Sequence, residues 1–234
     1  MGLKEELQAA ANPTKAKVLQ GFFRTGKGEY GEGDIFLGLT VPQTRAIAKR
    51  FTHLGLPEIK KSLESGFHEE RLCALLVLVH KFGKADEAEK EKIFDFYLAN
   101  ARRVNNWDMV DLTADKIVGE HLLANPSKKK ILPLLAASEN LWERRIAIIS
   151  TFALIKKGKA EDTFKISQLL LRDSHDLIHK AVGWMLREVG KRVSEEEEEK
   201  FLAPRYKKMP RTMLRYAIER FQEKKRKAYL HGSI

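Results

Sequence analysis

The chain has 234 residues, with 43 Lys and Arg against 32 Asp and Glu, and a formal net charge of +11. Hydrophobic residues make up 43% and charged residues 32%, which excludes a mainly disordered chain and a disulfide-stabilised miniprotein. The single Cys73 cannot form an internal disulfide, and no apolar run is long enough to span a bilayer. We therefore expect a cytoplasmic protein with no membrane association, and the positive charge favours a polyanionic partner.

Apolar residues recur at helical spacing along almost the whole chain, whereas alternating strand patterns are nearly absent. Gly and Pro fall between these periodic stretches, where helix ends belong. The sequence therefore predicts an all-α protein. The clearest apolar stripes are Leu72, Leu75, Leu76 and Val79; Trp142, Ile146, Ile149 and Ala153; and Ile178, Val182, Met185 and Val189.

Short tetrads, each a cation followed by three apolar positions, begin at Arg71, Arg145, Lys180 and Arg215. Their leading residues are 74, 35 and 35 positions apart, and Asp111 begins a similar tetrad inside the long first interval. Intervals of this size are typical of two-helix solenoid repeats, in which equivalent positions line one surface. We expect a right-handed α-solenoid of HEAT-like antiparallel helix pairs, with a concave basic groove that contains one carboxylate.

Two tryptophans are predicted to flank this groove. Trp107 begins a helix capped by Asn105 or Asn106, one turn before Asp111, so both side chains share a face. Trp184 lies one turn from Lys180 on a polar helix face, where it is either a partly buried boundary residue or an exposed stacking surface. Trp142, within an apolar stripe, is expected to pack in the core.

The Arg144–Arg145 doublet presents two different helix faces. Arg145 neighbours apolar residues, and its expected partner is Asp111, with Glu143 as the local alternative. Arg144 is expected to face solvent.

Other candidate motifs fail on context. The glycine pattern at 26–31 follows a helix instead of a strand, so a flexible loop is the expectation. His175 and His179 lack a third metal ligand and fit a capping and surface role. Asp108, Asp111 and Asp115 share a helix face, but three helical carboxylates without a loop make a poor cation site. We expect no metal and no cofactor.

The charge of the chain is concentrated near residue 234. Residues 201–234 hold ten basic side chains and two glutamates, a formal charge of +8. This segment is predicted to form a helix over 210–229, with Leu214, Ile218 and Phe221 inward and a cationic face that is either solvated or in contact with phosphates. The preceding Glu195–Glu199 run is interpreted as a solvated helix start capped by Ser194.

Four segments resemble the AlkD-type DNA alkylation-repair glycosylases, which are built from HEAT-like repeats. The segments occur in family order, and the resemblance covers roughly residues 5–230. They are residues 30–39 (YGEGDIFLGL), 105–111 (NNWDMVD), 142–147 (WERRIA) and 180–187 (KAVGWMLR).

The resemblance implies a single glycosylase domain over residues 1–234 that hydrolyses the N-glycosidic bond of N3- and N7-alkylated purines in double-stranded DNA. By position, Asp111 is similar to the catalytic carboxylate, Trp107 and Trp184 to the aromatic walls of the site, and Arg145 to the arginine beside the lesion.

Weaker contacts to the DNA backbone are expected from four cations, three of which begin tetrads. They are Arg71, Lys180, Arg187 and Arg215. We expect a monomer associated with the nucleoid. The alternatives are a catalytically silent repeat module that binds nucleic acid and a protein-scaffolding solenoid.

Overall fold

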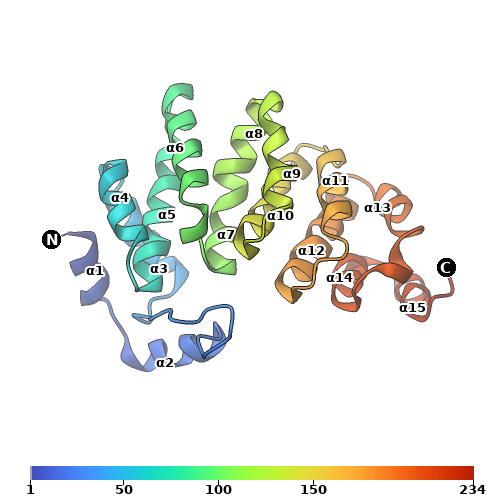
Figure 1. Cartoon of the computed structure of the whole chain (residues 1–234), viewed down its shortest axis with the longest axis horizontal. Helices are drawn as coiled ribbons and strands as arrows, with labels where there is room; N and C mark the ends of the chain where they lie inside the picture. The colour runs from blue at the N-terminus through green and yellow to red at the C-terminus, as the bar shows by residue number, and fades with distance from the viewer. Residues whose placement is uncertain (1) are drawn as a thin grey trace. The chain divides into compact units, whose positions relative to one another are not determined.

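The structure is a computed structural model that describes residues 2–234. Within these residues the chain forms helices and no β-strand, and an isolated parallel bridge joins Ile35 to Phe67 (Figure 1). The all-α prediction is confirmed. No helix in the described residues is both long and apolar enough to cross a membrane.

The chain divides into two compact units, one ending at Thr113 and the other beginning at Ala114. The sequence predicted one domain over residues 1–234, and that remains a prediction about how the chain behaves in solution.

The first unit is built around α5, which is buried along most of its length and packs against α3 and α4. Local sequence sets the helix starts: Asn12 caps α2 ahead of Pro13, and the Asp86 carboxylate accepts from the N–H of Glu89 at 2.8 Å to begin α6. The helices are α1 (Leu3–Ala9), α2 (Pro13–Phe22), α3 (Val41–Arg50), α4 (Leu56–Leu63), α5 (His68–Phe82), α6 (Glu87–Ala99) and α7 (Trp107–Ala114), whose last residue belongs to the second unit.

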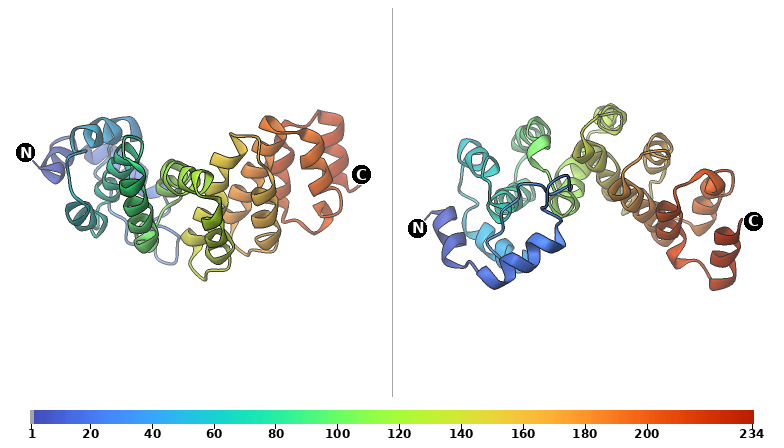
Figure 2. Two further views of the ribbon diagram at one scale, coloured as in Figure 1. Left: turned by 90° about the horizontal axis from the view of Figure 1, so that it is seen from above. Right: turned by 60° about the horizontal axis from the view of Figure 1, so that its bottom comes forward.

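The second unit stacks helices in successive pairs (Figure 2). α10 packs against α9 and α12, and α12 packs against α11 and α14, as in two-helix repeats. Its helices are α8 (Glu120–Ala124), α9 (Ile131–Ala136), α10 (Leu141–Ile155), α11 (Glu161–Leu169), α12 (Asp176–Arg192), α13 (Glu195–Leu202), α14 (Arg211–Ala217) and α15 (Glu223–His231), with a π-helical segment at Asp115–Gly119.

The tetrads identified in the sequence fall in one register of these helices. Asp111, Arg145, Lys180 and Arg215 are each the fifth residue of α7, α10, α12 and α14, and Arg71 is the fourth residue of α5. The spacing of the tetrads therefore follows the helical repeat, as predicted.

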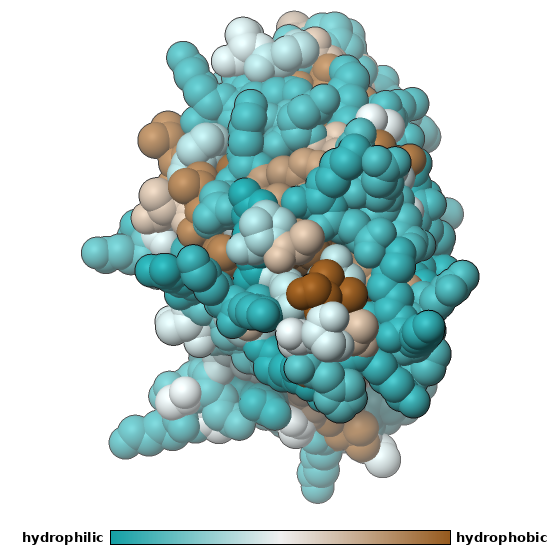
Figure 3. All heavy atoms as spheres, turned by 90° about the vertical axis from the view of Figure 1, so that its right-hand side faces the viewer, coloured by the Kyte–Doolittle hydropathy of each residue, from teal (hydrophilic) through white to brown (hydrophobic). Residues whose placement is uncertain are grey.

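The predicted helix over 210–229 is wrong in one respect. The chain leaves α14 through a 3₁₀ turn at Ile218–Arg220, and Phe221 is extended before α15 begins at Glu223. This break lets the Phe221 ring turn inward, where its centroid lies 5.6 Å from that of Tyr229. Leu214, Ile218 and Phe221 are buried as predicted. The surface seen from the α15 end of the chain is largely hydrophilic (Figure 3).

The acidic run is a helix start, as predicted, because the Ser194 hydroxyl accepts from the N–H of Glu197 at 3.2 Å. It is not solvated throughout, however. Glu198 is only 2% exposed, since it is turned against α12 at Gly190.

Candidate functional site

The first turn of α7 is fixed by side chains that accept from its own backbone. Asn106 Oδ1 accepts from the N–H of Trp107 at 2.8 Å, and Asp108 Oδ1 accepts from the N–H of Met109 at 2.8 Å. Asn106 is fully buried, so the cap is part of the core rather than a surface feature. The predicted helix start at Trp107 is confirmed, with Asn106 as the capping residue.

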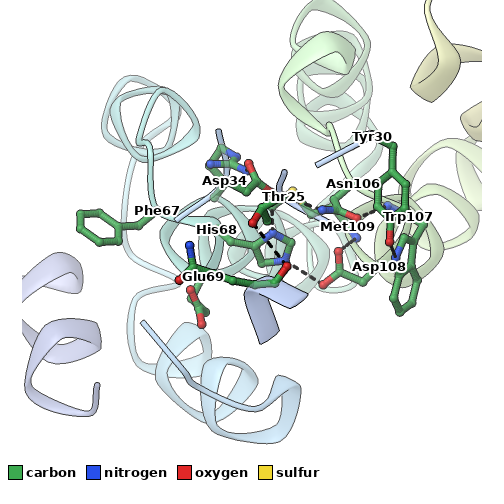
Figure 4. Close-up of polar contacts among 12 residues, drawn as sticks. Thr25, Tyr30, Asp34, Phe67, His68, Glu69, Asn106, Trp107, Asp108 and Met109 are labelled. Carbon is green, nitrogen blue, oxygen red and sulfur yellow. Dashed lines mark hydrogen bonds and ion pairs between the residues drawn. The ribbon is translucent and has the colours of Figure 1, made fainter. Parts of the chain in front are cut away.

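Trp107 is held among aromatic residues at the end of α2 and just after it. Its ring stacks on Phe23 with centroids 5.1 Å apart and an interplanar angle of 13°, and Phe22 meets it edge-on at 6.0 Å. Its indole Nε1 donates to the Tyr30 hydroxyl at 3.2 Å, a contact visible in Figure 4. The indole is therefore a fixed wall that remains partly exposed.

Trp107 and Asp111 line the same open pocket in the first unit, with a volume of about 320 Å³. Its surface is mostly apolar and aromatic, and the polar groups among its lining residues are few. They are Thr40, His68, Glu69, Asp108 and Asp111. Asp111 is half-buried at this pocket, so its carboxylate stands at the edge of an apolar surface. Such surroundings strengthen the field of a carboxylate on any cation brought beside it.

A buried ionic cluster lies behind this pocket, centred on His68 (Figure 4). His68 Nδ1 is 3.0 Å from Asp34 Oδ2 and His68 Nε2 is 2.9 Å from Asp108 Oδ2. Arg71 donates to the second oxygen of Asp34 at 2.5 Å, and Asn106 donates to Asp34 at 3.2 Å. All five residues are at least 94% buried.

The charges of the cluster reinforce one another. Burial alone would lower the pKa of His68, but the Asp108 and Asp34 carboxylates outweigh it and raise the pKa to about 9. Burial would raise the pKa of Asp34, but the His68 hydrogen bond and the Arg71 guanidinium hold it below its usual value. His68 is therefore an imidazolium at neutral pH, and the two cations balance the two carboxylates.

The segment before α3 is clamped to the start of α5 by a neighbouring carboxylate. Glu69 accepts from the backbone N–H groups of Leu37, Gly38 and Leu39 at 2.8–3.1 Å. Gly38 has φ of +90°, and a side chain there would meet the Asn12 carbonyl, so this close approach requires glycine.

Arg71 belongs to the buried cluster. Its side chain is 4% exposed and is held by Asp34 and by the Ser65 carbonyl, 2.9 Å from Nη1. Its helix turns this position toward residues 34 and 65, and the predicted contact of Arg71 with the DNA backbone stays a prediction.

The arginine doublet of α10 is also arranged differently from the prediction. Arg144, expected to face solvent, contacts Asp173 at 2.6 Å and donates to the carbonyls of Ser138 and Glu139. Arg145 is 4% exposed and donates to the carbonyl of Leu177 in the first turn of α12. Both arginines tie α10 to the turn that precedes α12 or to α12 itself. The predicted contact of Arg145 with DNA, and its pairing with Asp111 or Glu143, stay predictions.

Trp184 of α12 is partly exposed, and its ring lies 6.0 Å from that of Phe152 at 44°. Trp184 is therefore a boundary residue, with part of its ring accessible to solvent. Trp142 is 7% exposed, which confirms its predicted place in the core.

Three of the four predicted backbone-binding cations meet in the second unit. Lys180, Arg187 and Arg215 line one open pocket of about 610 Å³. Lys180 is paired with Asp176 at 2.7 Å, and Arg187 is paired with Glu219. The three cations on α12 and α14 therefore lie around one pocket, although two of them already form ion pairs with carboxylates of the protein.

Two of the three aspartates considered as a cation site are paired with separate cations. Asp108 is paired with His68, and Asp115 contacts Lys116 at 2.8 Å and Lys156 at 3.2 Å. Among residues 2–234 no group of three or more His, Cys, Asp or Glu side chains is placed to hold a metal ion.

His175 caps a helix, as interpreted. His175 Nδ1 accepts from the N–H of Leu177 at 3.1 Å and caps α12, and His179 lies against the Asp173 carbonyl. Cys73 is buried, and burial raises the pKa of its thiol to about 12. The glycine-rich segment at 26–31 is a series of turns.

Stacked helix pairs with a carboxylate and a tryptophan on one helix define an all-α helical-repeat protein with an acidic, aromatic-lined site. The chain matches the family described as "DNA alkylation repair enzyme" over residues 3–221, and it belongs to that family. This confirms the resemblance read from the four sequence segments.

A solved structure described as a predicted DNA alkylation repair enzyme from Enterococcus faecalis has the same fold. It superposes with a TM-score of 0.71 at 17% sequence identity, covering 91% of this chain and 97% of that one. No curated protein matches the sequence. The family supports a role in DNA repair.

Sequence reasoning missed the polar cluster behind the pocket. Asp34 lies within the segment 30–39 and Asp108 within 105–111. Asp108 was considered only as a poor cation ligand, Asp34 was assigned no role, and His68 belongs to no motif. The only signal was the presence of charged residues inside segments that are otherwise apolar.

Proposed function

We propose that this protein is a DNA glycosylase that releases N3- and N7-alkylated purines, such as 3-methyladenine and 7-methylguanine, from double-stranded DNA. The observation that carries the proposal is that Asp111 and Trp107 line one open, mainly apolar pocket. The membership in the DNA alkylation repair family supports it.

The chemistry required is modest because the substrate base is already activated. Alkylation at N3 of adenine or N7 of guanine makes the base cationic, so it leaves as a neutral molecule when the N-glycosidic bond breaks. Positive charge then develops on the deoxyribose, as in glycoside hydrolysis. The bond that forms is from a water oxygen to C1′, and that water loses one proton.

Asp111 has the properties that this step needs. Its carboxylate would stabilise the oxocarbenium-like transition state electrostatically and orient the attacking water. Trp107 would pack against the sugar or the cationic base, with a cation–π contribution, and exclude bulk water. Trp184 would supply a second aromatic surface. No cofactor or metal is required for this scheme.

Contacts to the phosphates would come from the second unit. Lys180, Arg187 and Arg215 line one pocket there, and they are the cations that we assign to the DNA backbone. Because Asp176 and Glu219 occupy two of them, binding would exchange a protein carboxylate for a phosphate. Arg145 would act beside the lesion after its guanidinium leaves the Leu177 carbonyl.

The decisive experiment is base release. Duplex DNA containing 7-methylguanine is incubated with wild type and Asp111→Asn, in the presence of EDTA, and free base is measured. We expect release by wild type and a loss of about 10²–10³-fold in the variant, comparable to removing one transition-state electrostatic contact. Equal release by both would refute the assignment of Asp111.

The same preparation separates the alternatives. A silent nucleic-acid-binding module predicts salt-sensitive duplex binding without release of any base. A scaffolding solenoid predicts negligible DNA affinity even at low salt. Arg215→Ala should reduce the salt dependence of duplex binding by about one counterion, whereas Lys92→Ala, on an exposed face of α6, serves as the control.

A further inference from the structure

The buried cluster around His68 has no assigned role. Burying charged groups costs several kcal/mol each, and apolar residues of the same volume often stabilise a protein equally well. Stability alone is therefore a poor reason for an imidazolium, a guanidinium and two carboxylates in this interior. The cluster lies behind the pocket that contains Asp111, and His68 and Asp108 also line that pocket.

We propose that His68 is a positioning residue, which fixes the first turn of α7, and with it Trp107 and Asp111, by bridging the carboxylates of Asp34 and Asp108. The proposal rests on the function proposed above for Asp111. It also gives a role to the segment 30–39, which resembles the family but contains none of the assigned site residues.

The geometry of the bridge is strict. Nδ1 of His68 faces Asp34 at 3.0 Å and Nε2 faces Asp108 at 2.9 Å, so the ring uses both nitrogens as donors. Only the imidazolium carries a proton on each nitrogen. The ring also stacks on Phe36, with centroids 4.4 Å apart and an interplanar angle of 21°, which restricts its rotation.

The bridge connects three elements. Asp34 belongs to the segment 30–39, His68 begins α5, and Asp108 lies in the first turn of α7. The segment is fixed independently to α5, because the N–H of His68 donates to the Ile35 carbonyl at 2.8 Å and Glu69 accepts from residues 37–39. Asp108 is therefore anchored to an already rigid support.

The anchor acts directly on the proposed reactive groups. Asp108 follows Trp107 in the chain, and Asp111 lies one turn further along the same helix face. The same segment that supplies Asp34 also supplies Tyr30, whose hydroxyl accepts from Trp107 Nε1. A rotation of this turn would displace the indole and the carboxylate together.

His68 cannot act by touching the substrate, because it is only 2% exposed. Loss of its proton would affect its two partners unequally. Asp34 would keep Arg71 and Asn106, whereas the carboxylate of Asp108 would lose its cation. Deprotonation of His68 would therefore weaken the contact with Asp108 on α7 more than the contact with Asp34.

The first test measures the reaction. His68→Gln is compared with wild type in single-turnover release of 7-methylguanine and in the Kd for the same duplex. We expect a rate lower by about tenfold to a hundredfold, since misplacement of about 1 Å has effects of this size. The Kd should change by less than about threefold, because His68 is buried and makes no contact of its own with the phosphates.

A matched control corrects for lost stability. His121 is also 2% exposed but lies in the second unit, so His121→Gln should leave the rate unchanged under conditions where both variants are folded by circular dichroism. Equal rates for the two variants, or a loss of duplex affinity that accounts for the whole defect, would overturn the proposal.

A second test does not depend on activity. With 5-fluorotryptophan, fluorine NMR gives a resonance for each of the three tryptophans, and Trp107→Phe identifies one of them. We expect the Trp107 resonance to shift in His68→Gln and to titrate in wild type with a midpoint near pH 9, with no such titration in the variant. Tyr30→Phe removes the phenol that accepts from the indole, so that its ionisation cannot account for the titration.

The outcomes separate the two proposals. If wild type releases no base but the Trp107 resonance responds as expected, the glycosylase function fails and the positioning role stands. If base is released and the resonance is insensitive to His68→Gln, the positioning role is refuted while the glycosylase function stands.

Discussion

Glu198 offers a quantitative test of the structure that does not involve the proposed reaction. Its side chain is buried against α12, and Oε1 has no hydrogen-bond partner within the described residues. Burial, followed by the neighbouring Glu195 and Glu199, raises the pKa of Glu198 to about 9, against the opposing effect of Arg187 and Lys225. We expect Glu198→Gln to stabilise the protein at neutral pH.

The sign follows from proton binding. An acid whose pKa is higher in the folded state than its ordinary value of 4.5 retains a proton that the unfolded chain releases. Wild type therefore loses stability as the pH rises from 4.5 toward 9, and the glutamine variant does not. At pH 7 the difference amounts to about 3 kcal/mol, and it approaches zero near pH 4.5.

Thermal unfolding at pH 5 and pH 7.5 measures this difference. For a chain of this length each kcal/mol corresponds to about 2–4 °C, so the variant should melt about 8–16 °C above wild type at pH 7.5 but only about 2–3 °C above it at pH 5. Glu196→Gln is the matched control, because Glu196 lies in the same first turn but is exposed. The Glu196→Gln variant measures how much stability is lost when a first-turn carboxylate no longer interacts with the helix dipole.

A gain in melting temperature that is equal at both pH values, or equal in the two variants, would refute the reasoning. The first result would show that Glu198 is ionised in the folded protein. The second would show that the gain comes from relieving repulsion along the acidic run rather than from burial.

Three further predictions concern packing, capping and reactivity. Gly183→Ala should lower the unfolding free energy by about 1–3 kcal/mol, because a Cβ there would lie 2.4 Å from the Met213 carbonyl, whereas Gly21→Ala, with open space around it, should not destabilise. Asn140→Ala should cost about 1 kcal/mol in thermal or denaturant unfolding, since its side chain accepts from two N–H groups at the start of α10. The Cys73 thiol should react with a disulfide reagent at pH 8 only at the rate of unfolding, and rapid labelling of the folded chain would contradict its burial.

The sequence alone determined the features that depend on neighbours along the chain. Helical spacing predicted the all-α fold, and the intervals between tetrads placed Asp111, Lys180 and Arg215 in one register of successive helices. Trp107 and Asp111 could be assigned to one helix face because residues four apart in a helix are always adjacent.

Only the tertiary structure decided which charges are buried. Arg71, interpreted as a DNA contact, is enclosed with Asp34, which lies 37 residues earlier in the chain. Arg145 reaches Leu177 at a separation of 32 residues, and His68 reaches Asp108 at a separation of 40. Helical periodicity reports which face a residue occupies but not which distant carboxylate or carbonyl will meet it there.

The charge pattern near residue 234 shows the same division. The sequence separates an acidic run from a basic segment of formal charge +8, and each could be solvated. In the folded chain Lys225 lies 2.8 Å from both Glu195 and Glu199, while Glu198 between them is buried. Charge composition is fixed by the sequence, but the environment that sets the pKa of each group exists only when separate helices pack together.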